Sequence, residues 1–123
     1  MELSKKYSYS QFAKDIDALA KELNQFKPFI KKIYGIPRGG LMVAVALSHK
    51  LDIPVEISKD KIDKGTLIVD EISDSGDTLE KLLEGKKYYR IATLWSTVET
   101  KMKPDFFCNL KKKAWIQFPW EIK

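Results

Sequence analysis

The stretch Thr66-Leu-Ile-Val-Asp-Glu-Ile-Ser-Asp-Ser-Gly-Asp-Thr78 decides the fold of this chain. Its apolar run, Leu67 to Val69, is typical of a buried strand and ends in two adjacent carboxylates, Asp70 and Glu71. A small polar turn follows, and the apolar spacing of a helix begins near residue 75. This order predicts a buried strand, an acidic loop and the start of a helix.

The same order fits a bound phosphate and the hydroxyls of a sugar. Backbone N–H groups at a helix start are unpaired and lie at the positive end of the helix dipole, so they attract an anion. Gly76 allows close approach of the backbone, and the Ser75 and Thr78 hydroxyls can donate to phosphate oxygens. Paired carboxylates can accept from vicinal hydroxyls or bind Mg²⁺. The alternative is an ordinary turn capped by Asp and Ser, which the complete order of residues disfavours.

The stretch resembles the ribose-phosphate signature of the type I phosphoribosyltransferases, with Glu71 where Asp is the commoner second acid. The resemblance implies that Asp70 and Glu71 hold the ribose hydroxyls of phosphoribosyl pyrophosphate (PRPP), directly or through Mg²⁺, the implied cofactor. In members that use purines, the residue at the position of Asp74 is the candidate acid or base at the purine N7. The residues implied to surround the 5′-phosphate are Asp74, Ser75, Gly76, Asp77 and Thr78.

A second strand-to-helix turn lies in Lys32-Ile-Tyr-Gly-Ile-Pro-Arg-Gly-Gly40, before the helical stretch 41–51. Two glycines at such a junction let N–H groups face an anion, and Arg38 adds a forked cationic donor. In the family this turn is the pyrophosphate loop, so Arg38, Gly39 and Gly40 are implied to hold the leaving group, and a strained or cis peptide is common there. For the motif alone, a tight turn with an exposed Arg is the alternative.

The C-terminal stretch Lys113-Ala-Trp-Ile-Gln-Phe-Pro-Trp-Glu-Ile-Lys123 predicts a packed, extended tail, because its Pro and aromatic residues do not suit a helix. It resembles the ending of bacterial and archaeal xanthine–guanine and hypoxanthine–guanine transferases. The resemblance implies that Trp115 stacks on the purine and that Ile116 contacts the edge of the base. The alternative is that Trp115, Phe118 and Trp120 close a small hydrophobic core; Trp120 is expected to be structural.

Two departures from the family pattern concern the base and the lid. Purine-using relatives carry a Lys that binds the 6-oxo group, but Ser96 or Thr97 falls at that position here, with Lys101 or Lys103 as substitutes from the next loop. A hydroxyl accepts as well as donates, so the sequence does not decide which nucleobase is used. The family's long hood over PRPP is reduced to the eight residues 58–65. With so short a hood, either a neighbouring subunit supplies the lid over PRPP or turnover is slow.

The rest of the chain predicts one domain over residues 1–123. Strands are expected near 30–34, 54–58, 66–70 and 89–95, and helices near 8–26, 39–51 and 75–84. Such alternation predicts an α/β fold with a mostly parallel central sheet flanked by helices, which is the type I phosphoribosyltransferase fold with a shortened hood. The first helix is expected to begin with a capping box at Ser8 and Gln11.

The net charge indicates which partners to expect, and the cysteine content indicates the cellular compartment. Lysines and arginines number 22 against 17 acidic residues, a net charge of +5, but the lysines are scattered along the chain. We therefore expect a solvated surface that attracts anionic PRPP, and no nucleic-acid or membrane partner. A single cysteine, Cys108, and no signal or membrane-spanning run predict a cytoplasmic protein.

Together these patterns predict Mg²⁺-assisted transfer of the phosphoribosyl group from PRPP to a nucleobase, a purine by resemblance, with release of pyrophosphate. Asp74 and Arg38 are the expected catalytic residues, Asp70 and Glu71 the expected metal ligands, and a homodimer is the implied assembly. A catalytically weak sensor of PRPP or nucleotide on the same fold is the main alternative. A basic nucleic-acid-binding domain is the other.

Overall fold

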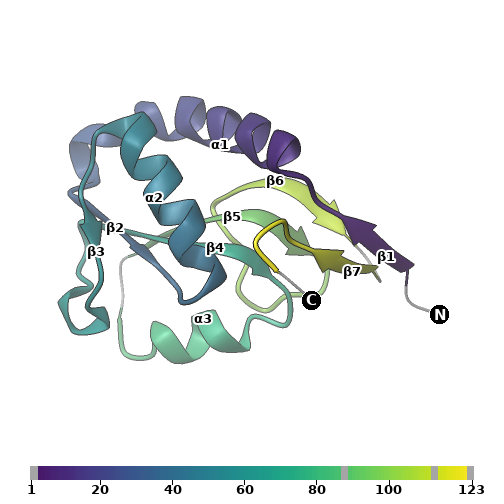
Figure 1. Ribbon diagram of the computed structural model, residues 1–123. Coiled ribbons are helices and arrows are strands. Elements are labelled where there is room, and N and C mark those ends of the chain that lie inside the picture. The colour runs from purple at the N-terminus through teal and green to yellow at the C-terminus, as the bar shows by residue number, and fades with distance from the viewer. Residues whose placement is uncertain (1–2, 87–88, 112–113, 122–123) are drawn as a thin grey trace.

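A computed structural model describes residues 3–86, 89–111 and 114–121 (Figure 1). Five strands form a parallel sheet in the order β3-β2-β4-β5-β6, and β1 pairs with β7 in a second, parallel sheet of two strands. The strands are β1 (Leu3–Lys6), β2 (Lys32–Gly35), β3 (Val55–Glu56), β4 (Thr66–Ser73), β5 (Arg90–Thr97), β6 (Phe106–Lys111) and β7 (Ala114–Gln117). The helices are α1 (Tyr9–Asn24), α2 (Gly39–Leu51) and α3 (Asp77–Leu82), with single 3₁₀ turns η1 (Lys27–Phe29) and η2 (Lys59–Lys61).

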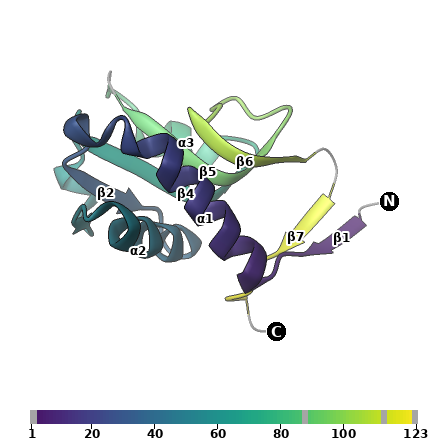
Figure 2. The same ribbon diagram turned by 90° about the horizontal axis from the view of Figure 1, so that it is seen from above.

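Helices cover both faces of the five-stranded sheet, as the sequence predicted. Helices α1 and α2 lie on one face and α3 on the other (Figures 1 and 2). The apolar run of β4 explains this arrangement, because successive side chains of a strand point to opposite faces. Leu67 and Val69 pack in the core under α1 and α2, while Ile68 packs with Leu79 of α3. A strand buried on both faces needs a continuous apolar run.

Three strands and the ends of several elements differ from the prediction. Strand β4 continues to Ser73 because β5 is equally long and pairs with it as far as Ser96, so the acidic pair lies inside the strand. Helix α3 is shorter than expected and begins only after Gly76, whose φ of 89° is left-handed. Strands β1 and β6 were not predicted as strands, and the tail predicted as extended contains β7.

The order of the strands changes direction between β2 and β4. The chain passes from β2 to β3 on one side, and then to β4 on the other side of β2. The helices that follow β2 and β4 consequently lie on opposite faces, so the two loops diverge at the carboxyl edge. Ligands of parallel α/β sheets bind at such a switch point. Both motifs singled out in the sequence lie there.

The two-stranded sheet brings the ends of the described chain together at one side of the molecule (Figures 1 and 2). Ser4 pairs with Trp115, and the Tyr7 backbone N–H donates to Gln117 O at 2.9 Å. The capping box of Ser8 and Gln11 is confirmed at the start of α1. In the part of the chain that the structure describes, no helix has the length and apolar character needed to span a membrane.

Candidate active site

The acidic pair lies on β4 near the carboxyl edge of the sheet and lines a cavity there. Asp70 is only 7% exposed, and its Oδ1 accepts a 2.8 Å hydrogen bond from the Glu71 backbone N–H. Burial raises the pKa of Asp70 to about 9, and the neighbouring Glu71 carboxyl adds to the rise. The pair therefore favours a ligand that brings positive charge or hydroxyl donors.

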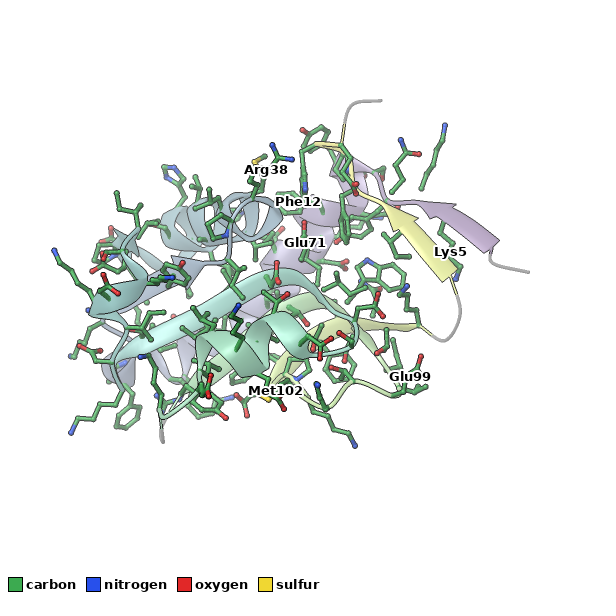
Figure 3. The ribbon with its side chains drawn as sticks, turned by 90° about the horizontal axis from the view of Figure 1, so that it is seen from below. Lys5, Phe12, Arg38, Glu71, Glu99 and Met102 are labelled. Atoms are coloured by element: carbon green, nitrogen blue, oxygen red, sulfur yellow. The ribbon has the colours of Figure 1, made fainter. Side chains whose placement is uncertain are left out.

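The Pro-Arg-Gly-Gly turn closes against this pair. The peptide bond between Pro37 and Arg38 is cis, and Arg38 precedes the first residue of α2. The Glu71 carboxyl lies against Gly39 so closely that a Cβ there would be 2.6 Å from Glu71 Oε1. Figure 3 shows Arg38 and Glu71 at the same end of the sheet. Folding thus brings together two predicted motifs that lie about thirty residues apart in the sequence.

The loop after β4 packs against the 98–105 connection on one side and borders a cavity on the other. Gly76 faces the 98–105 connection, where a Cβ would lie 2.8 Å from Met102 N, and the Ser73 and Thr100 hydroxyls are 2.8 Å apart. A cavity of about 220 Å³ opens on the front of the loop. Its lining residues are Asp70, Glu71, Ile72, Ser73, Asp74, Ser75, Gly76, Asp77, Thr78 and Leu79. The predicted phosphate-binding residues therefore surround one cavity.

A second cavity, also of about 220 Å³, opens between β4 and the C-terminal tail. Glu71, Ile72 and Asp74 line both cavities, so the two adjoin. The other lining residues are Lys111, Ile116, Phe118 and Glu121. One cavity with polar loop residues next to one with apolar walls can hold a molecule with a phosphorylated sugar and a flat ring.

Known proteins resemble this chain over most of its length. No protein-family model matches it. The xanthine-guanine phosphoribosyltransferase of Idiomarina loihiensis is 28% identical over 115 residues, which cover 75% of this chain and 71% of that protein. The crystal structure of a purine phosphoribosyltransferase from Pyrococcus horikoshii is 32% identical with a TM-score of 0.82, covering 98% of this chain and 95% of that one. This chain belongs to the type I phosphoribosyltransferase family.

A second solved structure agrees with that family. The xanthine-guanine-hypoxanthine phosphoribosyltransferase of Helicobacter pylori is 28% identical with a TM-score of 0.80, covering 97% of this chain and 94% of that one. The predicted fold, an α/β domain with a mostly parallel sheet and the type I phosphoribosyltransferase architecture, is therefore confirmed.

The C-terminal tail supplies one wall of the second cavity in this family member. Ile116 is 5% exposed, and the Phe118 backbone N–H donates to Glu121 Oε1 at 2.9 Å. Trp120 stacks on Phe118 and contacts Phe12 of α1, which is the structural role predicted for it. The side chain of Trp115 lies outside the described residues, so its predicted stacking on a base stays a prediction.

The predicted substitutes for the family's base-binding lysine do not line the cavity. Ser96 and Thr97 are both 2% exposed, and their hydroxyls donate to backbone oxygens of Thr97 and Asp74 respectively. Lys101 pairs with Asp77 and Glu80 of α3.

Sequence reasoning missed Lys111, which does line the cavity. It stands at the end of β6, opposite Thr97 of β5. In the sequence it belongs to a run of three lysines, interpreted as solvated surface. Only the register of β6 could have shown that the first of them reaches the site.

The connection that the sequence analysis interpreted as a shortened hood spans residues 57–65, between β3 and β4. The connection between β3 and β4 is held against the α3 side of the sheet, where Ile62 is buried and Lys32 pairs with Asp63 at 3.4 Å. Of the residues described for both cavities, none comes from this connection.

The donor set for a metal is the acidic pair itself. Among the described residues, no group of three or more His, Cys, Asp or Glu side chains is arranged to hold a metal ion. Two carboxylates supply the hard oxygen donors that Mg²⁺ prefers, and their mutual repulsion favours a divalent cation. Asp70 and Glu71 therefore fit Mg²⁺ that takes its remaining ligands from substrate and water.

Proposed function

We propose that this protein transfers the 5-phosphoribosyl group from PRPP to a purine base and releases pyrophosphate. The observation that carries the proposal is the shared wall of the two cavities: Glu71, Ile72 and Asp74 line both the cavity at the loop after β4 and the cavity at the C-terminal tail. The names of the relatives, xanthine-guanine and purine phosphoribosyltransferases, support a purine as acceptor. Purine salvage is the corresponding role.

In the proposed reaction, the bond between C1′ and the pyrophosphate oxygen breaks, and a bond forms between C1′ and a nitrogen of the base. Negative charge gathers on pyrophosphate, where Arg38 and the N–H group of Gly39 would stabilise it. The N–H group of Gly40 donates to Ile36 O at 2.8 Å, so it would support the turn and would not contact the leaving group. The base loses a proton as it attacks, and Asp74, exposed beside both cavities, would accept or direct that proton. Residues Ser75 to Thr78 would hold the 5′-phosphate, and Ile116 would contact the base.

Asp70 and Glu71 would position the ribose hydroxyls and hold Mg²⁺. The metal, when bound, would supply positive charge to the pyrophosphate as it leaves. The buried, protonated Asp70 of the free protein would lose its proton when a cation binds, because the cation opposes the repulsion between the two carboxyls.

The test is pyrophosphate release from PRPP and Mg²⁺ in the presence of guanine, xanthine, hypoxanthine, adenine or uracil, with a sample without base as control. We expect release that depends on a purine and a matching nucleotide product by chromatography. Equal release in every sample, including the control without base, would contradict the proposal.

The short connection between β3 and β4 favours a second function for the same site, which is nucleotide or PRPP binding with little turnover. A site that stays open to water protects a reactive intermediate poorly. Saturable binding of PRPP or nucleotide by calorimetry, together with no pyrophosphate release for any base, would establish this function and exclude the first.

We also propose the homodimer that the family resemblance implies. Phe107 and Leu110 on the edge strand β6 are 42% and 56% exposed and would suit contact with a second copy. Light scattering after size exclusion should give twice the mass of the 14.2 kDa chain. A monomer at all concentrations up to about 100 µM would contradict a stable dimer.

A further inference from the structure

One buried side chain beside the site has no role in the proposed reaction. Thr97 is the last residue of β5 and is 2% exposed, and its hydroxyl donates to the backbone oxygen of Asp74. Its place in the sequence made it a candidate for contact with the base, but it is not among the residues described as lining either cavity. The hydrogen bond to the loop therefore needs another explanation.

A hydroxyl at a buried position of a strand carries a free-energy cost unless it is hydrogen-bonded. Valine has nearly the same shape as threonine and suits a strand equally well, without a polar group that needs a partner. Asp74 follows Ser73, the last residue of β4, so its backbone oxygen lies just beyond the part of β4 that pairs with β5. The Thr97 hydroxyl thus takes the place of a hydrogen bond between the strands and fixes the peptide group that follows Asp74.

The residues on either side of Asp74 are tied to the connection after β5 by other hydrogen bonds. The Ser73 hydroxyl donates to Met102 O at 2.8 Å, and the Lys101 backbone N–H donates to Ser75 O at 3.2 Å. Neither of these hydrogen bonds involves the threonine hydroxyl. The part of the loop proposed for the phosphate therefore keeps both of them when that hydroxyl is removed, whereas the backbone of Asp74 is released.

We propose that Thr97 is a positioning residue for Asp74, the group that would accept or direct the proton of the incoming base. This inference rests on the proposed function and deepens it. Because the Asp74 side chain is exposed and borders both cavities, its carboxylate is directed by its own backbone more than by side chains packed around it. A misplacement of about 1 Å can lower a rate by about a hundredfold, so a fixed backbone at this position matters for turnover.

The experiment compares the steady-state kinetics of wild type, Thr97→Val, Thr97→Ser and the control Thr66→Val. Thr66 is also 2% exposed, but its hydroxyl donates to Asp63 at the opposite edge of the sheet. Thr97→Val should lower kcat with guanine by about tenfold to a hundredfold and change KM for PRPP by less than about twofold, because the other hydrogen bonds of the loop remain. Thr97→Ser keeps a hydroxyl and should restore kcat to within about threefold of wild type.

The control separates positioning from stability. Both valine variants should melt at a lower temperature than wild type, because each loses the hydrogen bonds of a buried hydroxyl. Only Thr97→Val should lose kcat. An equal loss of kcat in Thr66→Val would show that reduced stability, and not the position of Asp74, causes the effect, and would overturn the role proposed for Thr97.

The backbone order parameter of Asp74, measured by NMR relaxation on the same four proteins without ligands, separates this inference from the proposed function. It should fall from about 0.85 toward about 0.6 in Thr97→Val alone. If no base is turned over, a fall confined to Thr97→Val supports the positioning role while the enzyme assignment fails, and an unchanged order parameter overturns both. If transfer occurs and Thr97→Val keeps the wild-type kcat, the positioning role is overturned and the enzyme assignment stands.

Discussion

The two strand-to-helix turns at the carboxyl edge are held in opposite ways. The turn between β2 and α2 is fixed by backbone packing: a Cβ at Gly35 would lie 2.7 Å from Gly40 C and 2.8 Å from Ala44 Cβ. The loop between β4 and α3 is fixed by hydrogen bonds to the 98–105 connection, such as Lys101 N–H to Ser75 O at 3.2 Å. Its acidic residues Asp74 and Asp77 are exposed.

This difference suggests that the first turn contributes mainly to stability and the second mainly to activity. In the first turn, the glycines allow the backbones to pack, and Arg38 is the single charged side chain. In the second, the exposed Asp74 side chain can meet a ligand without disturbing the core, whereas Asp77 pairs with Lys101. Substitutions should therefore damage stability in the first turn and activity in the second.

Asp74→Asn should give the largest effect, in the second turn. Removal of the proton acceptor should lower kcat with guanine by about 10²- to 10⁴-fold, the usual contribution of a general acid or base. Because the Asp74 side chain is exposed, the melting temperature should stay within about 2 °C of wild type. Asp52→Asn, an exposed acid at the end of α2, is the matched control. Full activity in Asp74→Asn would contradict the expectation that the second turn contributes to activity.

Gly35→Ala should test the first turn. The added methyl group meets backbone atoms of Gly40, which cannot rotate away, so the free energy of unfolding in urea should fall by about 3 kcal/mol. Gly65→Ala is the control, since the nearest atom there is the flexible Lys31 Cγ at 3.2 Å, and it should change stability by less than about 1 kcal/mol. Equal losses in the two variants would show that close packing does not hold this turn.

Arg38→Ala should affect activity and leave stability unchanged, although Arg38 lies in the first turn. Arg38 is the one side chain of that turn that we expect to contact substrate. Loss of a forked donor to pyrophosphate should raise KM for PRPP by about tenfold to a hundredfold with unchanged stability. Arg38→Lys should recover only part of the loss, since an ammonium lacks the planar fork. An unchanged KM in steady-state kinetics would remove Arg38 from the site.

Asp70 should give the smallest effect, measured against pH in the protein without ligands. Its pKa of about 9 means that the folded protein keeps a proton that the unfolded chain releases above about pH 4, so stability falls as the pH rises through this range. Between pH 6 and pH 7, the free energy of unfolding of wild type should fall by about 1 kcal/mol more than that of Asp70→Asn in urea unfolding. Parallel curves would show that Asp70 is ionised in the folded state.

Local sequence predicted both turns well, because strand, turn and helix signals follow one another within a few residues. The bounds of α2 agree with the predicted 39–51. The full length of β4 could not be predicted from local sequence, because its extension to Ser73 depends on pairing with β5. The same limit applies to α3, which starts late because Gly76 adopts a left-handed conformation.

The second cavity could be predicted only in part. The apolar tail identified Ile116, but Lys111 escaped notice because its place depends on the register between β5 and β6. The parallel pair of β1 and β7 joins the two ends of the described chain, and no local pattern indicates such a contact. Residue type was enough to locate the two turns, whereas the opposite wall of the second cavity could be located only from the fold.

The pairing of β1 with β7 has a consequence for the order in which the protein is made. The residues of the phosphate loop and of the Pro-Arg-Gly-Gly turn leave the ribosome well before the tail. The wall that contains Ile116 and Phe118 forms only when the tail reaches back to Leu3–Tyr7, which was synthesised earlier. A nascent chain can thus complete the half of the site proposed for the phosphates while the half proposed for the base is still missing.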